Sequence, residues 1–333
     1  MATLREVAAH AGVSLSTAWR VAQGGAQVRP ETRGRVERAM RELLYIAPAE
    51  SDAAMIGLLV PELENPIFPA LAQAIETRAA HVGLSSILCN TEGATRREID
   101  YVHTLLDRRV AGMIFISCEM TNLRGDHDHY GRLAEEGARL VFVNGALSSL
   151  NVPSVGVDER MAGEAATRHL LGLGHRRIGF VAGREDYLPT RLKANGRAAA
   201  LRAAGQPPSD ELVVHNDFSV EGGRAGLRAL LGSESAPTGV ICSSDVIAIG
   251  VLLEALERRI DVPRDLSIVG FDGIAATTWT QPPLTTVEQP IAQIADTAVR
   301  ALQTLIDDPH AQLPSSYFRP SLRVRGSTGP PRA

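Results

Sequence analysis

The sequence predicts an α/β protein with a small N-terminal helix-turn-helix domain and a two-lobed core built on parallel sheets. Three observations favour this fold class. The first 46 residues form short amphipathic segments around a glycine break, whereas apolar runs alternate with helical stretches from Met55 onward. Residues 1–46 carry seven arginines against four acidic residues, and the remainder carries 27 basic against 34 acidic residues. A basic N-terminal domain followed by an acidic core is expected when only the N-terminal domain contacts nucleic acid.

The first two helices are predicted from periodicity and capping. Apolar side chains recur at i, i+3, i+4 and i+7 over residues 4–11, which indicates an amphipathic helix. Gly12 interrupts it, and Ser14 is a suitable N-cap for a second helix. A third helix follows, with Pro30 near its first turn. Its predicted inner face consists of Val36, Ala39, Met40 and Leu43.

The second helix is predicted to expose a chemically active face. On a helical wheel Ala18 and Val21 point inward. The opposite side carries Leu15, Ser16, Trp19 and Arg20. Arginine can bond bidentately to a guanine edge, and hydroxyls at a helix start suit phosphate. The sequence therefore favours a DNA-reading helix, although the helix pattern alone would also fit an ordinary three-helix domain.

The amino-acid sequence of this region indicates a particular protein family, which its helix pattern alone does not. LREVAAHAGVSLSTAWRVAQGG followed by VRPETRGRVERAMRELLY resembles the DNA-binding domain of the LacI/GalR repressor family over residues 3–45. The resemblance implies that double-stranded operator DNA is the partner. It places Leu15, Ser16 and Arg20 at base-reading positions, with Ser14 and Thr17 toward phosphate.

Residues 47–54, APAESDAA, are interpreted as a linker between the domain of residues 1–46 and the core. The family usually carries a longer segment here, whose leucine enters the minor groove as part of a hinge helix. Such a wedge needs an apolar side chain and nearby cations. This linker has neither a leucine nor an arginine, so we expect a plain tether and little central bending of the DNA.

Nine strands are predicted in the core, at 55–60, 85–89, 112–116, 139–143, 154–157, 177–182, 212–215, 239–242 and 266–271. They are too many for one small sheet, so two α/β lobes are expected. Most of them end in polar residues, such as Asn90, Ser117 and Asp272. Open α/β sheets bind ligands just outside the carboxyl ends of their strands. The pattern therefore predicts a ligand cleft between the lobes.

Blocks such as IGLLVPELENPIF and ICSSDVIAIGVLLEALERRIDVPRDLSIVGFDG resemble the core of the same family, which is similar to periplasmic sugar-binding proteins. The resemblance implies an effector-binding and dimerisation core over 55–326. Its chain crosses between the lobes three times. Lobe 1 is then expected at about 55–153 and 281–310, and lobe 2 at about 154–280 and 311–326.

The resemblance also implies a set of effector-binding residues, since carboxylates and amides bind hydroxyls and an aromatic ring stacks on a sugar or base face. The family's cationic ligand contact falls on Lys193, and Arg191 is an alternative two residues earlier. The full predicted set is Asn65, Phe68, Asn90, Ser117, Asn144, Arg191, Lys193, Phe218, Asp245 and Asp272.

The remaining motifs do not indicate a metal site, a cofactor site or an enzyme active site. RGDHDHYG at 124–131 has metal-type residues, but the same composition describes a solvated loop. The three cysteines lack metal spacing and are expected to be buried or partly buried free thiols. Phosphate-loop and hydrolase motifs are missing from the sequence, so we predict no cofactor, no metal and no enzyme activity.

The preferred interpretation is a cytoplasmic, ligand-responsive transcription regulator, most simply a repressor, acting as a homodimer or a larger assembly. The start of the sequence lacks a signal-peptide pattern, and no run of 18 apolar residues occurs. A sugar is the favoured effector, with nucleosides and phosphorylated metabolites, including sugar phosphates, left open. The alternatives are a solute-binding sensor whose head no longer reads DNA, and an α/β enzyme with an appended head.

Overall fold

The computed structural model describes residues 2–22, 28–43, 45, 54–234 and 236–332, in two compact units that divide after residue 54. The predicted linker lies outside the described residues except for Ala54. Within the described ranges, no helix is both long and apolar enough to span a membrane.

The N-terminal unit contains α1 (Leu4–His10), α2 (Leu15–Ala22) and α3 (Pro30–Glu42). Thr3 caps α1, because its side chain accepts a hydrogen bond from the Glu6 backbone N–H and the Glu6 carboxylate accepts one from the Thr3 backbone N–H. The buried core of the unit is Val7, Ala8, Ala11, Ala18, Val21, Val36 and Ala39. The predicted inner face of α2 is therefore confirmed.

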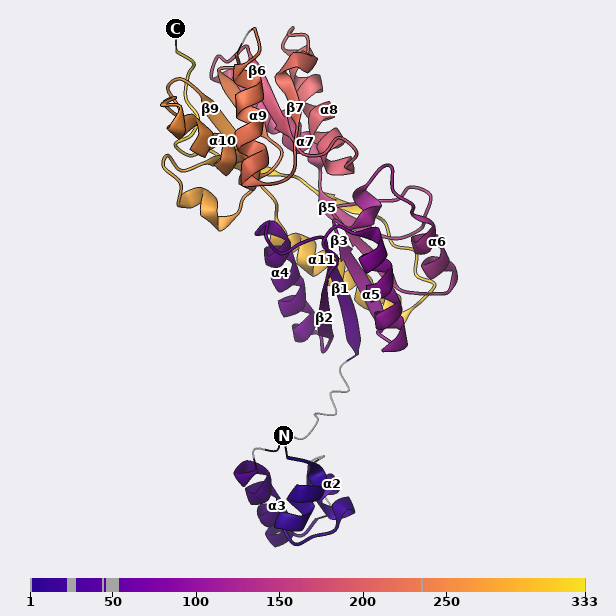
Figure 1. Cartoon of the computed structure of the whole chain (residues 1–333). Helices are drawn as coiled ribbons and strands as arrows, with labels where there is room; N and C mark the ends of the chain where they lie inside the picture. The colour runs from indigo at the N-terminus through magenta and orange to yellow at the C-terminus, as the bar shows by residue number, and fades with distance from the viewer. Residues whose placement is uncertain (1, 23–27, 44, 46–53, 235, 333) are drawn as a thin grey trace. The chain divides into compact units, whose positions relative to one another are not determined.

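The first core sheet has the strand order β11-β5-β4-β3-β1-β2, and every pairing within it is parallel. Its strands are β1 (Met55–Val60), β2 (Ser85–Asn90), β3 (Gly112–Ile116), β4 (Leu140–Val143), β5 (Ser154–Val157) and β11 (Ser316–Phe318). Its helices are α4 (Ile67–His81), α5 (Thr95–Asp107), α6 (Asp128–Glu135) and α11 (Ile291–Asp307), with the 3-10 turn η1 (Glu119–Thr121). Figure 1 shows α11, from the C-terminal part of the chain, lying among these N-terminal elements.

The second sheet has the order β12-β10-β9-β8-β6-β7 and is parallel except for the β10–β12 pair. Its strands are β6 (Ile178–Ala182), β7 (Val213–His215), β8 (Gly239–Cys242), β9 (Ser267–Asp272), β10 (Thr285–Glu288) and β12 (Ser321–Arg323). Its helices are α7 (Glu159–Gly172), α8 (Leu188–Ala203), α9 (Val220–Leu231) and α10 (Asp245–Glu257). Two 3-10 turns, η2 (Asp210–Leu212) and η3 (Ala275–Thr278), complete this lobe.

The chain passes between the two lobes three times, but not where the sequence placed the boundaries. The first passage follows β5, the second lies between β10 and α11, and the third lies between β11 and β12. Residues 154–157 therefore belong to lobe 1, residues 285–288 belong to lobe 2, and 316–318 belong to lobe 1. The expected ranges were wrong at these points because the strand that a short segment pairs with is set by contacts distant in the chain.

The strands are apolar because both faces of each sheet are covered by helices. In lobe 1, Val102 of α5 and Leu133 of α6 pack with Phe115 and Phe142 of the central strands. The second lobe has a matching core around Leu227, Val240 and Val251. All three cysteines are buried free thiols, as the sequence predicts. This packing leaves the strand ends as the places where polar side chains collect.

Candidate functional site

The outer face of α2 is the first candidate site. Leu15 and Trp19 are 45 % and 50 % exposed, and Ser16 and Arg20 are exposed beside them. The Ser14 hydroxyl accepts a hydrogen bond from the Thr17 backbone N–H at 3.3 Å and caps the helix start. Short polar groups, an arginine and an aromatic ring therefore share one surface of the N-terminal unit.

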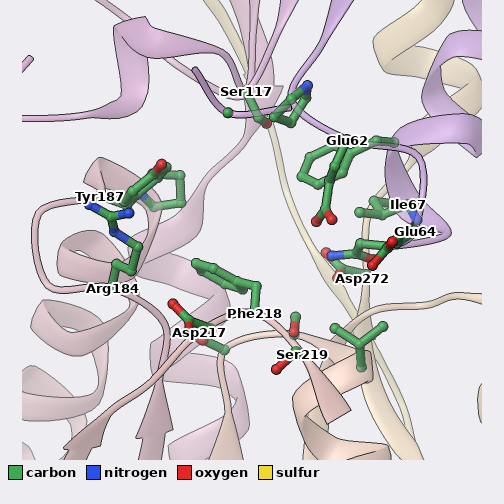
Figure 2. A pocket seen from close by; sticks show the side chains of 18 of the residues that line it. Glu62, Glu64, Ile67, Ser117, Arg184, Tyr187, Asp217, Phe218, Ser219 and Asp272 are labelled. Carbon is green, nitrogen blue, oxygen red and sulfur yellow. Dashed lines mark hydrogen bonds between the residues drawn. The ribbon is translucent and has the colours of Figure 1, made fainter. Parts of the chain in front are cut away.

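The second candidate site is a cleft of about 870 Å³ between the two core lobes. It lies at the carboxyl ends of the strands of both sheets, as the sequence predicts for a doubly wound fold. Eight of the predicted effector residues line it: Asn65, Phe68, Asn90, Ser117, Asn144, Lys193, Phe218 and Asp272. Figure 2 shows Ser117 from one lobe and Phe218, Ser219 and Asp272 from the other around one space.

Four of the lining residues other than glycine have positive φ, among them Glu92 at +52° in the turn after β2. Ser117, Asn144 and Asp272 follow or end strands and have φ values of +48°, +57° and +121°. Residues other than glycine seldom adopt positive φ, and such strain concentrates at functional sites. The position and the strain together mark these strand ends as a binding surface.

Two predicted residues do not line the cleft, which corrects the predicted set. Asp245 is completely buried; its Oδ2 accepts hydrogen bonds from the backbone N–H groups of Gly273 and Ile274 at 2.7 and 2.9 Å, and its Oδ1 accepts one from the Thr286 hydroxyl at 2.6 Å. It anchors the loop after β9 instead of facing a ligand. Arg191 is exposed on α8, because a shift of two positions from Lys193 turns a side chain to roughly the opposite face of a helix.

Lys193 lines the cleft but is already neutralised. Its Nζ lies 2.6 Å from the Glu159 Oε2 and 3.8 Å from the centroid of the Phe271 ring. Burial raises the pKa of Glu159, and the Lys193 ammonium opposes that effect. The predicted cationic ligand contact is therefore one half of a buried ion pair.

A chain of side-chain hydrogen bonds joins the lobes across the floor of the cleft. The Asn144 amide donates to the Gln289 Oε1 at 2.9 Å, and the Gln289 amide donates to the Asp272 Oδ1 at 2.8 Å. Burial and the nearby Asp245 carboxylate raise the pKa of Asp272 well above its usual range. Asp272 is therefore linked directly to the passage between the lobes where Gln289 lies.

Aromatic side chains form one wall of the cleft. The rings of Tyr187 and Phe218 lie 6.4 Å apart, and the Arg184 guanidinium lies 5.2 Å from the Tyr187 centroid. Phe218 packs directly over Gly183, where an added Cβ would lie 2.0 Å from its ring. Figure 2 shows Phe218 directed toward the space between the lobes.

The same end of the cleft carries a backbone connection between the lobes. The Leu123 N–H donates to the Asp186 carbonyl at 2.7 Å, and Asn122 pairs antiparallel with Tyr187. We call this pair of contacts the interlobe bridge. It fixes the loop after β6 to the segment between η1 and α6.

Sequence reasoning missed several lining residues. Glu62 and Glu64 precede the predicted Asn65 in PELENP, so their place in the turn after β1 was a usable signal. Gln289 follows β10, a strand too short and polar to be predicted. The remaining missed residues with polar or aromatic side chains are Glu92, Thr121, Glu159, Arg184, Tyr187, Asp217, Ser219, Glu221, Ser243 and Phe271.

The electrostatics of the cleft disfavour an anion. Its walls carry seven acidic side chains and two basic ones. Both basic groups are paired, Lys193 with Glu159 and Arg184 with Asp186. Burial, followed by the charge of Glu64, raises the pKa of Glu62, which is the sign of crowded carboxylates. A phosphate or carboxylate ligand would find no uncommitted cation among the residues that line this cleft.

The two histidines of the segment at 124–131 make contacts within the protein. The His129 Nε2 lies 3.1 Å from the Glu98 Oε1, and the His127 Nε2 lies 3.0 Å from the Glu119 carbonyl. Over the described part of the chain, no group of three or more His, Cys, Asp or Glu side chains is arranged to hold a metal ion.

Comparison with known proteins gives matches for both parts of the chain. Residues 3–47 match the model for bacterial regulatory proteins of the lacI family, and residues 167–328 match a periplasmic binding protein-like domain. An uncharacterized HTH-type transcriptional regulator in the aml 5′ region of Streptomyces limosus is 42 % identical over 98 % of this chain and 94 % of its own length.

Two solved structures are similar over 98 % of the chain. A lac repressor dimer bound to operator and the anti-inducer ONPF has a TM-score of 0.80 at 26 % identity, with 99 % of that chain covered. A complex of the transcriptional regulator CelR with cellobiose has a TM-score of 0.76 at 27 % identity, with all of that chain covered.

Proposed function

The chain belongs to the LacI family of DNA-binding transcriptional regulators, and from this premise we propose that it is a repressor whose operator affinity is controlled by a neutral sugar. It is a regulator and not an enzyme. The observation that carries the proposal is the interlobe cleft, in which hydroxyl-binding side chains and a stacking ring converge without an uncommitted cation. The similar CelR structure holds cellobiose, and the similar lac repressor structure is bound to operator.

The neutral charge of the effector distinguishes this proposal from the wider set of ligands that the sequence left open. Amide and carboxylate groups bind sugar hydroxyls, and Phe218 offers a face for the apolar side of a sugar ring. Sugar phosphates would place a dianion among seven carboxylates. We therefore expect uncharged sugars to bind and their phosphates to bind weakly or not at all.

The DNA interface is proposed to be the exposed face of α2. Arg20 is expected to read a base edge together with Leu15 and Ser16, while Ser14 and Thr17 face phosphate. Trp19 is added to this set, because its 50 % exposed ring lies one helical turn from Leu15 and can contact a thymine methyl group.

A homodimer is the proposed working unit. Two recognition helices are needed to reach half-sites about one turn apart. Exposed apolar side chains are present in both lobes, with Leu88 48 %, Leu256 68 % and Trp279 79 % exposed. A contiguous apolar patch can mark an interface, whereas a single exposed apolar side chain need not, so the part played by each has to be tested. Sedimentation of Trp279→Glu against wild type tests the proposal, and unchanged assembly would remove Trp279 from the interface.

Ligand control is proposed to act through the relation between the lobes. A ligand shifts an equilibrium only if it binds the two states with different affinity. The Asn144–Gln289–Asp272 chain and the interlobe bridge both depend on that relation, so a ligand in the cleft would favour one arrangement.

A two-part experiment tests the proposal. Operators are selected from random DNA, and binding to them is measured at several salt concentrations with and without each candidate effector. Candidates come from a thermal-shift screen of neutral sugars, sugar phosphates and nucleosides, because a bound ligand raises apparent stability. We expect a neutral sugar to raise the melting temperature and to change operator affinity. A sugar phosphate or nucleoside as the only active ligand would refute the effector assignment.

A further inference from the structure

A second cavity of about 430 Å³ adjoins the cleft and has no role in the function proposed so far. Its walls combine Arg124 of lobe 1 with the loops after β6 and β7, residues 184–186 and 215–217. Arg184 and Asp217 line both cavities. The two cavities therefore meet at this pair of side chains, next to the aromatic wall.

Of the shared pair, the Arg184 side chain is held by several contacts. The Arg184 guanidinium donates from Nε and Nη2 to the two oxygens of Asp186, at 3.2 and 3.0 Å, and lies against the Tyr187 ring. The interlobe bridge fixes the Asp186 backbone to Leu123 of lobe 1. These contacts position Arg184 and the Asp186 backbone in a cavity whose walls come from both lobes.

The chemistry of the second cavity matches that of the cleft. Its lining side chains are all polar, with arginines and carboxylates in close proximity. Mixed charges of this kind offer donors and acceptors to hydroxyl groups but attract no net charge. Phe218 adjoins Asp217, so a sugar ring stacked there would direct its next unit toward the shared pair.

The size of the combined site exceeds the needs of a small sugar. Pockets of about 300–1,000 Å³ hold drug-sized ligands, and the cleft alone reaches 870 Å³ before the second cavity is added. From the continuity, the rigidity and the shared chemistry, we infer that the effector is a linear neutral oligosaccharide. Its inner units occupy the cleft and its outer units pass Arg184 and Asp217 into the second cavity.

This inference rests on the proposed sugar effector and narrows it to a chain of several units. The second cavity, here called the outer site, makes affinity depend on the length of the oligosaccharide. Its contacts are available only to a ligand that already fills the cleft. Arg124 and Glu185 are the best probes of it. Both are exposed and line only the second cavity, so their replacement by alanine leaves the cleft and the cores of the lobes unchanged.

The test uses the full-length protein and two probe series, α-1,4-linked and β-1,4-linked glucose oligomers of one to six units. Dissociation constants are measured by calorimetry for wild type, Arg124→Ala, Glu185→Ala and the matched control Arg108→Ala, an exposed arginine outside both cavities. In one series we expect affinity to keep rising beyond the disaccharide. Each outer-site variant should then lose about tenfold for the long oligomers and little for the short ones, while Arg108→Ala behaves as wild type.

Two results would overturn the inference alone. One is a disaccharide or smaller sugar that binds as tightly as any longer oligomer. The other is an equal loss at every length in the Arg124 and Glu185 variants. Failure of all oligomers of both linkages to bind, beside a sugar phosphate or nucleoside that does bind, would instead refute the sugar effector and the inference together.

Discussion

Asp272→Asn should weaken effector binding and stabilise the fold at the same time. The Asp272 Oδ1 accepts the Gln289 amide, whereas its Oδ2 accepts no hydrogen bond from any described residue and is left for a ligand. Asparagine has nearly the same shape, tolerates the positive φ at this position and keeps the bond from Gln289. The substitution therefore removes one acceptor oxygen and, at a pH above the raised pKa of Asp272, its negative charge.

The expected loss of affinity follows from that one contact. A hydrogen bond to a charged group contributes about 1.5–3 kcal/mol, so effector affinity measured above the raised pKa of Asp272 should fall by about tenfold to 150-fold, and by less below that pKa. Operator binding without effector should be unchanged. Calorimetry with the effector and anisotropy with operator DNA measure the two quantities, and exposed Asp100→Asn is the control.

The expected gain in stability has a defined pH dependence. Burial and Asp245 raise the pKa of Asp272 in the folded protein above its unfolded value near 3.9. The folded state then binds more protons than the unfolded state, so wild-type stability falls as pH rises from about 4 through the raised pKa. In Asp272→Asn the loss of stability that comes from ionising this carboxyl at high pH should disappear. The variant should therefore melt at a higher temperature than wild type at pH 8, with a smaller difference at pH 5. A variant that is less stable at pH 8 and binds effector normally would refute the reasoning.

Four further outcomes are expected. Arg20→Ala should cost about 1–3 kcal/mol on the best operator and relax preference at one base pair, measured by binding to an operator library; an equal loss on random DNA would mean a phosphate contact. Glu159→Gln should destabilise the core by about 3–5 kcal/mol in urea unfolding, because it leaves a buried ammonium unpaired, and a change below about 1 kcal/mol would contradict that. Gly183→Ala should displace Phe218 and lower effector affinity by about twofold to tenfold with operator binding intact; unchanged affinity would exclude stacking on this ring. A circular-permutation gel assay should show little bend at the operator centre, since residues 47–54 lack a wedge; a strong central bend would show a hinge.

Strands covered on both faces of a sheet could be predicted, because each of them appears in the sequence as a continuous apolar run. β1, β3 and β9 are of this kind. β10 reads Thr-Thr-Val-Glu and β12 reads Ser-Leu-Arg, so their local sequences carry no such signal. Their places in the second sheet depend on partners distant in the chain, and the lobe boundaries were misplaced for the same reason.

The cleft residues were predicted by a signal that has two meanings. A polar residue at the end of a strand often lines a ligand cleft, and Asn90 and Ser117 line the cleft here. The same position also starts the next helix, and Asp245 in α10 turns back to hold the loop after β9. Nothing in the local sequence separates these cases. The pairing of Lys193 with Glu159 was likewise hidden, because it requires the packing of α8 against α7.

The three passages between the lobes have a consequence for synthesis of the chain. β11 and β12 lie within residues 316–323, so each sheet receives its final strand from the last part of the chain to be made. Until then, lobe 1 also lacks α11, and the residues of α4 and β4 that contact this helix are uncovered. Exposed apolar surface and unpaired strand edges promote aggregation. Both lobes therefore stay incomplete during synthesis until the residues of β11 and β12 have been translated.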